Sequence, residues 1–267
     1  MTIKLRERVF RGLFVVSVAA SAAAVALVWW LGPLGLERVR ASGFGRPELA
    51  AFYTGLAAAG ACGVYGTIVS GLIAFRSGKT VSVEIFFFSL WAFCQSFELT
   101  RVAAVALVSV NSGSVVFELL TRAALFGRYG GTIAVFAGSL FSVGLKQERG
   151  EPLLGATLMA GLLFASIHPL NSVGPGVDFL VARGVEPLAR AFESAVILMA
   201  VVNYGIAWWS GRDKAYSLAG AGLVVCVAST MALRGASAPW LVAVAVPALG
   251  LGTWIYIKSL HDYYLWR

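Results

Sequence analysis

Long apolar stretches separated by short polar loops are the feature that most restricts how this chain can fold. A helix needs about 20 apolar residues to cross the roughly 30 Å hydrocarbon core of a bilayer. Eight stretches approach or exceed that length, at residues 13–31, 48–75, 84–110, 115–145, 153–168, 191–209, 215–233 and 239–260. Because backbone polar groups cannot stay unsatisfied in lipid, the sequence predicts an all-α integral membrane protein, a polytopic bundle of about eight transmembrane helices.

The composition agrees with a bilayer environment. Hydrophobic residues make up 59% of the 267 residues and charged residues only 13%, whereas about a quarter of the residues in an average soluble domain are charged. The short loops leave no room for a soluble unit, so residues 1–267 are expected to form one transmembrane domain. The net charge of +8 comes from basic residues dispersed among the loops, which indicates the lipid bilayer as a partner and not nucleic acid.

The helix count depends on the first apolar stretch. Four basic residues between Lys4 and Arg11 precede it, and it ends at Trp29 and Trp30. A signal peptide has an apolar core of about 7 to 15 residues, but this stretch is longer, and its tryptophans suit a membrane interface. We therefore expect an uncleaved first helix. Cleavage among the small residues 21–24 would leave seven helices, which is the alternative.

The distribution of basic residues predicts the orientation. Eight helices place both termini on the same side, and a cytoplasmic N-terminus puts twelve Lys and Arg residues inside and six outside. This asymmetry follows the positive-inside rule, so both termini are expected to be cytoplasmic. Arg outnumbers Lys 16 to 5, in a chain rich in Ala, Gly and Val. That composition is typical of bacteria with GC-rich genomes, which indicates a bacterial plasma (inner) membrane.

Glycines mark positions of close helix packing. The second stretch carries Gly55, Gly60, Gly63 and Gly66, and small residues let helix backbones approach closely in lipid. The fourth stretch would extend about 46 Å as a helix, so it must tilt, protrude or break. The glycines at 127, 130 and 131 are the predicted place for a break or a close approach.

Ionisable residues inside the apolar stretches are the functional candidates, since each costs about 2.5 to 3.5 kcal/mol in a membrane helix and usually faces a partner or water. Gln95, Glu98 and Arg101 recur every three residues on one side of the third stretch. Polar residues of three following stretches can face the same cavity. The resulting ligand-binding or ion-pair cluster comprises Gln95, Glu98, Arg101, Glu118, Arg122, Arg128, His168, Glu193, Asn203 and Tyr204.

Two interpretations of this cluster stay open. Glu98 with Arg101, and Glu118 with Arg122, have the spacing of structural ion pairs within a helix. Such a pair adds only a few tenths of a kcal/mol to an isolated helix, which is little compensation for placing two charges in lipid. The alternative is a solvated pocket in which guanidinium groups hold an anionic or carboxylate ligand, and we favour this second interpretation.

These features predict three classes of function. The first is a receptor-like or accessory subunit that binds a small anionic ligand from the outer side and passes its output to a separate signalling or membrane partner protein. The alternative is a proton-coupled secondary transporter that uses Glu98 or Glu118, and the third is an intramembrane enzyme that acts on lipid. Two histidines and three dispersed cysteines, Cys62, Cys94 and Cys226, offer no metal-ligand spacing. We therefore expect no metal, no cofactor and no catalytic motif, with the thiols buried as small apolar groups.

Overall fold

The computed structural model describes residues 3–41, 49–76, 82–109, 114–175, 179–211 and 213–265. Its α-helices are α1 (Ile3–Ala41), α2 (Leu49–Arg76), α3 (Val83–Cys94), α4 (Leu99–Ser109), α5 (Ser114–Ser142), α6 (Gly150–Ile167), α7 (Glu186–Gly211), α8 (Lys214–Arg234) and α9 (Pro239–Leu265). Two short 3₁₀ helices, η1 (Gln95–Glu98) and η2 (Gln147–Arg149), and two strands, β1 (Leu170–Pro175) and β2 (Val181–Arg183), complete the described elements.

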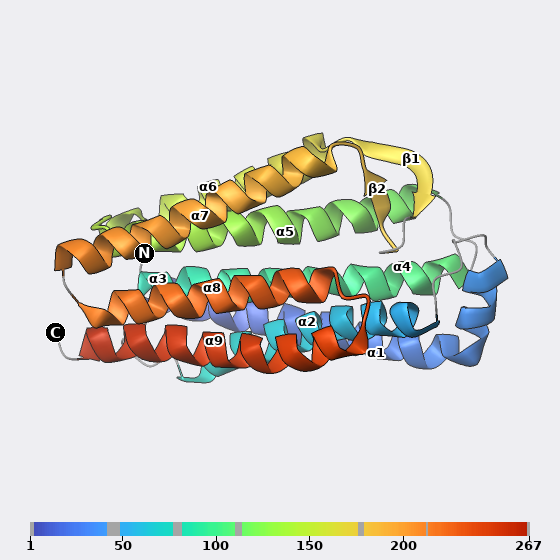
Figure 1. The fold of residues 1–267 in the computed structure, drawn as a ribbon, viewed down its shortest axis with the longest axis horizontal. Coiled ribbons are helices and arrows are strands. Elements are labelled where there is room, and N and C mark those ends of the chain that lie inside the picture. The colour runs from blue at the N-terminus through green and yellow to red at the C-terminus, as the bar shows by residue number, and fades with distance from the viewer. Residues whose placement is uncertain are drawn as a thin grey trace.

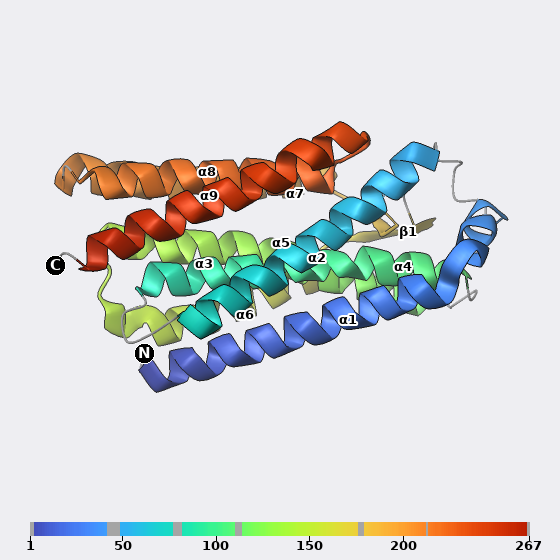
Figure 2. The ribbon, with the colours of Figure 1, turned by 90° about the horizontal axis from the view of Figure 1, so that it is seen from below.

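The helices run along a common long axis, and β1 and β2 lie at one end of the bundle (Figure 1). The N-terminal end of α1 and the C-terminal end of α9 both lie at the opposite end, as Figure 2 also shows. The elements α3, η1 and α4 follow one another as one central rod beside α2 and α5. Phe86, Phe87 and Phe88 of α3 are fully buried, which makes this rod the centre of the core.

The chain is an all-α, multi-pass membrane protein. Among the described residues, six helices are long and apolar enough to cross a membrane, namely α1, α2, α6, α7, α8 and α9. The remaining long segments, the α3–η1–α4 rod and α5, contain the buried residues Glu98, Arg101 and Arg128. Large apolar side chains such as Trp209 and Met159 are exposed on the outside of the bundle, as expected where lipid replaces water.

Glycine contacts confirm most of the predicted close approaches, whereas Gly60 of α2 has no described atom within 4 Å of an added Cβ. A Cβ atom added to Gly161 of α6 would lie 2.8 Å from the Cα atom of Gly130 in α5, so the two backbones touch there. Gly63 and Gly66 of α2 likewise meet Leu99 and the Ala92–Ser96 turn. The helix break falls elsewhere, because α5 is continuous from Ser114 to Ser142 while the third stretch changes to 3₁₀ geometry at η1.

The connection before α7 is more ordered than its prolines and glycines suggest. Strands β1 and β2 form an antiparallel hairpin with irregular register, and the backbone N–H of Val181 donates to Thr121 Oγ1 of α5 at 2.9 Å. Phe179 is buried with a positive φ of 65° and packs edge-on against Phe52 of α2. This hairpin therefore connects the N-terminal end of α2 to α5 through these two contacts.

Some predicted helix ends shift. Helix α7 begins at Glu186 instead of residue 191, because Pro187 fits the first turn of a helix, where its missing N–H costs nothing. Arg190 donates to Glu186 at 2.9 Å across the same turn. Helix α1 continues to Ala41, beyond the apolar stretch that predicted it. The three cysteines are buried and free, as expected.

Candidate functional site

Glu98 and Arg128 form the centre of the buried polar site. Glu98 lies in η1 and is 2% exposed. Arg128 reaches it from α5 and donates from Nε to Oε1 at 2.8 Å and from Nη2 to Oε2 at 3.0 Å. This two-point geometry is the strong form of an arginine–carboxylate pair. Arg101 of α4, also buried, places Nη1 3.9 Å from Glu98 Oε2.

Arg234 brings α8 to the same carboxylate. Its Nε atom lies 3.1 Å from Glu98 Oε1, but the alignment is not that of a hydrogen bond. Its Nη2 atom donates to Gln95 Oε1 at 3.2 Å, and the Gln95 amide donates back to the carbonyl oxygen of Trp91. Arg234 is the last residue of α8, so its long side chain crosses from a helix end into the centre of the site.

Glu193 of α7 is the second buried carboxylate. Its Oε1 atom lies 3.9 Å from Arg183 Nη1, and its Oε2 atom lies 3.8 Å from Arg234 Nη1. Charge-assisted N–H···O bonds are about 2.7 to 2.9 Å long, so both contacts are too long by about an ångström. Arg183 is also held by Glu186. We call this group the arginine cluster; it consists of Gln95, Glu98, Arg101, Arg128, Arg183, Glu193 and Arg234.

His168 and Tyr129 lie beside the arginine cluster. The Tyr129 hydroxyl is 2.9 Å from His168 Nδ1, and the rings of Phe164 and Phe192 contact each other and Tyr129. Burial, with the nearby Arg183 guanidinium, lowers the pKa of His168, which lies just beyond α6.

Several buried polar side-chain atoms in this region have no hydrogen-bond partner in the described part of the chain. Among the described residues, five buried side-chain polar atoms have no hydrogen-bond partner. Three of them, His168 Nε2, Glu193 Oε1 and Arg234 Nε, belong to or adjoin the arginine cluster. An unsatisfied buried polar group costs about 1 to 3 kcal/mol, and three of the five such atoms among the described residues lie in this one region.

The structure brings together half of the residues predicted from the sequence. Gln95, Glu98, Arg101, Arg128 and Glu193 meet in the arginine cluster, and His168 adjoins it. Glu118 and Arg122 instead pair with each other at 2.8 Å on an exposed surface. Asn203 donates to Ser139 Oγ, and Tyr204 shares a 2.6 Å hydrogen bond with Tyr256, so these two connect helices outside the cluster.

Three participants were missed from the sequence. Arg183 lies in the connection between residues 168 and 191, and Arg234 directly follows the stretch 215–233, so the sequence predicts loop charges at both positions. Long arginine side chains can nevertheless reach into the bundle from such positions. Tyr129 lies among the glycines at 127, 130 and 131, where the sequence predicts a break or a close approach and no site residue. The one signal that bears on it is its position directly after Arg128, which places it on an adjacent face of the same helix.

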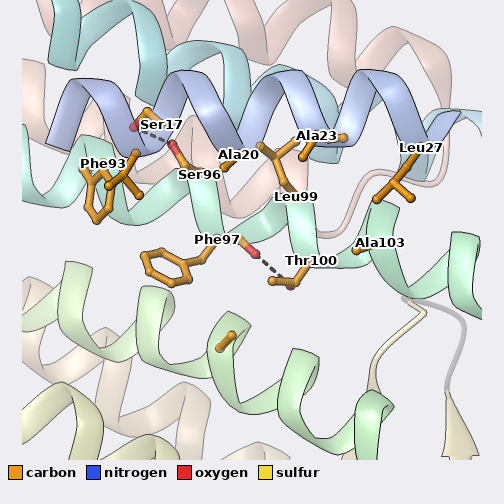
Figure 3. Close-up of a pocket in the computed structure, with 13 residues that line it drawn as sticks. Ser17, Ala20, Ala23, Leu27, Phe93, Ser96, Phe97, Leu99, Thr100 and Ala103 are labelled. Atoms are coloured by element: carbon orange, nitrogen blue, oxygen red, sulfur yellow. Dashed lines mark hydrogen bonds between the residues drawn. The ribbon is translucent and has the colours of Figure 1, made fainter. Parts of the chain in front are cut away.

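A separate groove lies between α1 and the α3–η1–α4 rod (Figure 3). Its volume is about 260 Å³, and alanines such as Ala20, Ala23 and Ala103 line it. The hydroxyls of Ser17 and Ser96 contact each other at 3.4 Å, and Thr100 donates to the carbonyl oxygen of Phe97. The groove therefore has apolar chemistry and shares no charged residue with the arginine cluster.

Neither the metal-binding side chains nor the comparison with known proteins assigns a function to the site. Within the described ranges, no three His, Cys, Asp or Glu side chains gather closely enough to hold a metal ion. No protein-family model and no curated protein matches the chain.

Proposed function

We propose that this multi-pass membrane protein is a receptor-like or accessory subunit that binds a small anionic ligand at the arginine cluster, from the end of the bundle that carries β1 and β2. The observation that carries the proposal is the convergence of arginines from α4, α5, β2 and α8 on only two buried carboxylates, Glu98 and Glu193. Guanidinium groups suit carboxylate and phosphate ligands because they present several donors in a fixed plane.

The geometry of the two carboxylates supports binding over a purely structural role. Glu98 has a closed two-point bond to Arg128 at 2.8 and 3.0 Å. Glu193 stands 3.8 to 3.9 Å from two guanidinium groups and keeps an unsatisfied oxygen. A structural ion pair in low dielectric needs close contact to offset desolvation, and only the Glu98 pair has it. Glu193 and Arg234 thus belong to the half of the cluster that receives the ligand.

The topology we propose has eight crossings, with the α3–η1–α4 rod and α5 added to the six apolar helices. The two ends of the described chain lie together in Figure 1, as an even number of crossings requires. The distribution of twelve inner against six outer basic residues favours cytoplasmic termini in a bacterial inner membrane. The end with β1 and β2 is then the outer one, and a signalling or membrane partner would receive the output.

Proton-coupled transport is the second candidate, and Glu193 favours it. The carboxylates predicted for coupling, Glu98 and Glu118, suit it poorly, because arginines hold both oxygens of Glu98 and Glu118 is half exposed. Glu193 is buried and has a free oxygen atom. If transport occurs, Glu193→Gln abolishes uptake coupled to a proton gradient while leaving ligand-induced thermal stabilisation measurable. Coupled uptake that persists in this variant would exclude the role.

The first test is the thermal stability of the purified protein with chloride, sulfate, phosphate and small carboxylates, the free amino acids included. A bound anion stabilises the folded state by mass action, so at least one should raise Tm of the wild type. Arg234→Gln should remove this increase. Arg190→Gln is the matched control, because Arg190 belongs to the same region but is 75% exposed. If none of these ligands stabilises the wild type, or both variants respond like it, the proposal fails.

A further inference from the structure

We infer that the ligand of the arginine cluster is a zwitterion that carries a carboxylate and an ammonium group close together, the class to which free amino acids belong. This inference rests on the proposed function and specifies its ligand. It follows from the one carboxylate that stands among the arginines without direct hydrogen bonds to them, Glu193.

Glu193 makes the site unfavourable for a simple anion. An anion that approaches Nη1 of Arg234 comes close to Glu193 Oε2, which lies 3.8 Å from that nitrogen. Two negative charges at such a distance repel each other strongly where water is excluded. A simple anion also cannot donate a hydrogen bond, so it would leave Glu193 Oε1 unsatisfied.

A zwitterion satisfies both kinds of unsatisfied atom. A carboxylate oxygen such as Glu193 Oε1 accepts a hydrogen bond from a donor such as an ammonium group, whereas the guanidinium of Arg234 donates only and needs an acceptor such as a carboxylate. Both groups must fit in a small space, because Glu193 joins Arg183 and Arg234 through contacts of 3.9 and 3.8 Å. A molecule with ammonium and carboxylate on one carbon atom meets this requirement.

Aromatic residues favour the same orientation. Phe192 directly precedes Glu193, and its ring centroid lies 4.8 Å from that of Phe164 and 5.9 Å from that of Tyr129. Aromatic faces attract cations, so the ammonium group is favoured on the Glu193 side and the carboxylate on the Arg234 side. His168 Nε2, buried and without a partner, adds one further hydrogen bond whose direction depends on the tautomer that Tyr129 selects.

The experiment compares each of the twenty free amino acids by thermal shift and calorimetry of the purified full chain. The one that binds most tightly is then compared with its N-acetyl derivative, which lacks the ammonium charge, and its amide, which lacks the carboxylate. We expect at least tenfold weaker binding for each derivative. This comparison uses the wild-type protein alone, so it does not depend on any variant folding.

Two variants test which residue binds the ammonium group of the ligand and which binds its carboxylate. Glu193→Gln should abolish the preference for the amino acid over its N-acetyl derivative, and Arg234→Gln should abolish the preference over its amide. Arg190→Gln should keep both preferences. Zwitterion binding that neither cluster variant alters would place the site elsewhere and overturn the inference.

The other outcomes separate this inference from the function it rests on. If sulfate or acetate binds in an Arg234-dependent way and no amino acid binds better, the ligand is a simple anion, so the inference is wrong while the proposed function stands. If neither amino acids nor anions bind, both are wrong.

Discussion

Arg128 of α5 holds Glu98 through two parallel hydrogen bonds of 2.8 and 3.0 Å at η1, where the α3–η1–α4 rod leaves α-helical geometry. The pair joins two central elements of the bundle, and both side chains are buried. Arg101 and Arg234 approach the same carboxylate from α4 and α8. Glu98 is therefore the anion around which the charged interior is organised.

Glu98→Gln should destabilise the bundle more than any other single neutralisation in the cluster. It removes the negative charge that three guanidinium groups share, and breaking a buried ion pair typically costs about 3 to 5 kcal/mol. Arg128→Gln should cost less, because Arg101 and Arg234 still face Glu98. The double variant should be more stable than Glu98→Gln alone, since it removes one of the uncompensated cations. Thermal unfolding in detergent measures all three.

The matched control for these variants is Glu118→Gln. Glu118 also pairs with an arginine at 2.8 Å, but it is half exposed, and exposed pairs are worth about 0 to 1 kcal/mol. The Tm of Glu118→Gln should stay close to that of the wild type. Equal losses in Glu98→Gln and Glu118→Gln would contradict the organising role of Glu98.

Gly161→Ala should weaken the contact between α6 and α5. The added Cβ would lie 2.8 Å from the Gly130 Cα atom, and backbone cannot move aside cheaply. Overpacking of this kind typically costs about 1 to 3 kcal/mol. Gly155→Ala on the same helix meets no atom within 4 Å and should be neutral or slightly stabilising, because Ala favours helix more than Gly does. Similar Tm values for the two variants would show that α5 and α6 do not touch at Gly130.

Hydropathy predicted the helices well, because membrane helices must be long and apolar whatever their neighbours are. It also located Glu98, Arg101 and Arg128, whose charges stand out within apolar stretches. It could not separate them from Glu118 and Arg122, which have equally suggestive spacing but pair with each other outside the arginine cluster, since helix rotation depends on tertiary packing. Arg183 and Arg234 escaped prediction for a related reason, because a position in a loop or directly after an apolar stretch does not reveal where the side chain points.

The pKa of His168 predicts acid sensitivity. Burial, helped by Arg183, lowers this pKa in the folded state below the ordinary value of 6.5, so the unfolded chain binds more protons in that range. Stability then rises with pH across this window and is lost as the pH falls from about 6.5 toward the folded-state pKa. His168→Gln should flatten the dependence of Tm on pH in this window. His261→Gln, at an exposed position of α9, should retain the wild-type slope.

Arg122→Gln should destabilise α6 although the Arg122–Glu118 pair itself contributes little. Besides its bond to Glu118, Arg122 donates from Nη1 to the carbonyl oxygens of Ala165 and Ser166 in the last turn of α6. The last four carbonyls of a helix lack partners within it, and an arginine that satisfies them acts as a cap. A hydrogen bond to a charged group contributes about 1.5 to 3 kcal/mol, so Arg122→Gln should lower Tm clearly more than Glu118→Gln does. Hydrogen exchange provides the local test: amides in the last turn of α6 should exchange faster in Arg122→Gln and at the wild-type rate in Glu118→Gln. If both variants lose the same stability, the ion pair and not the cap carries the contribution of Arg122.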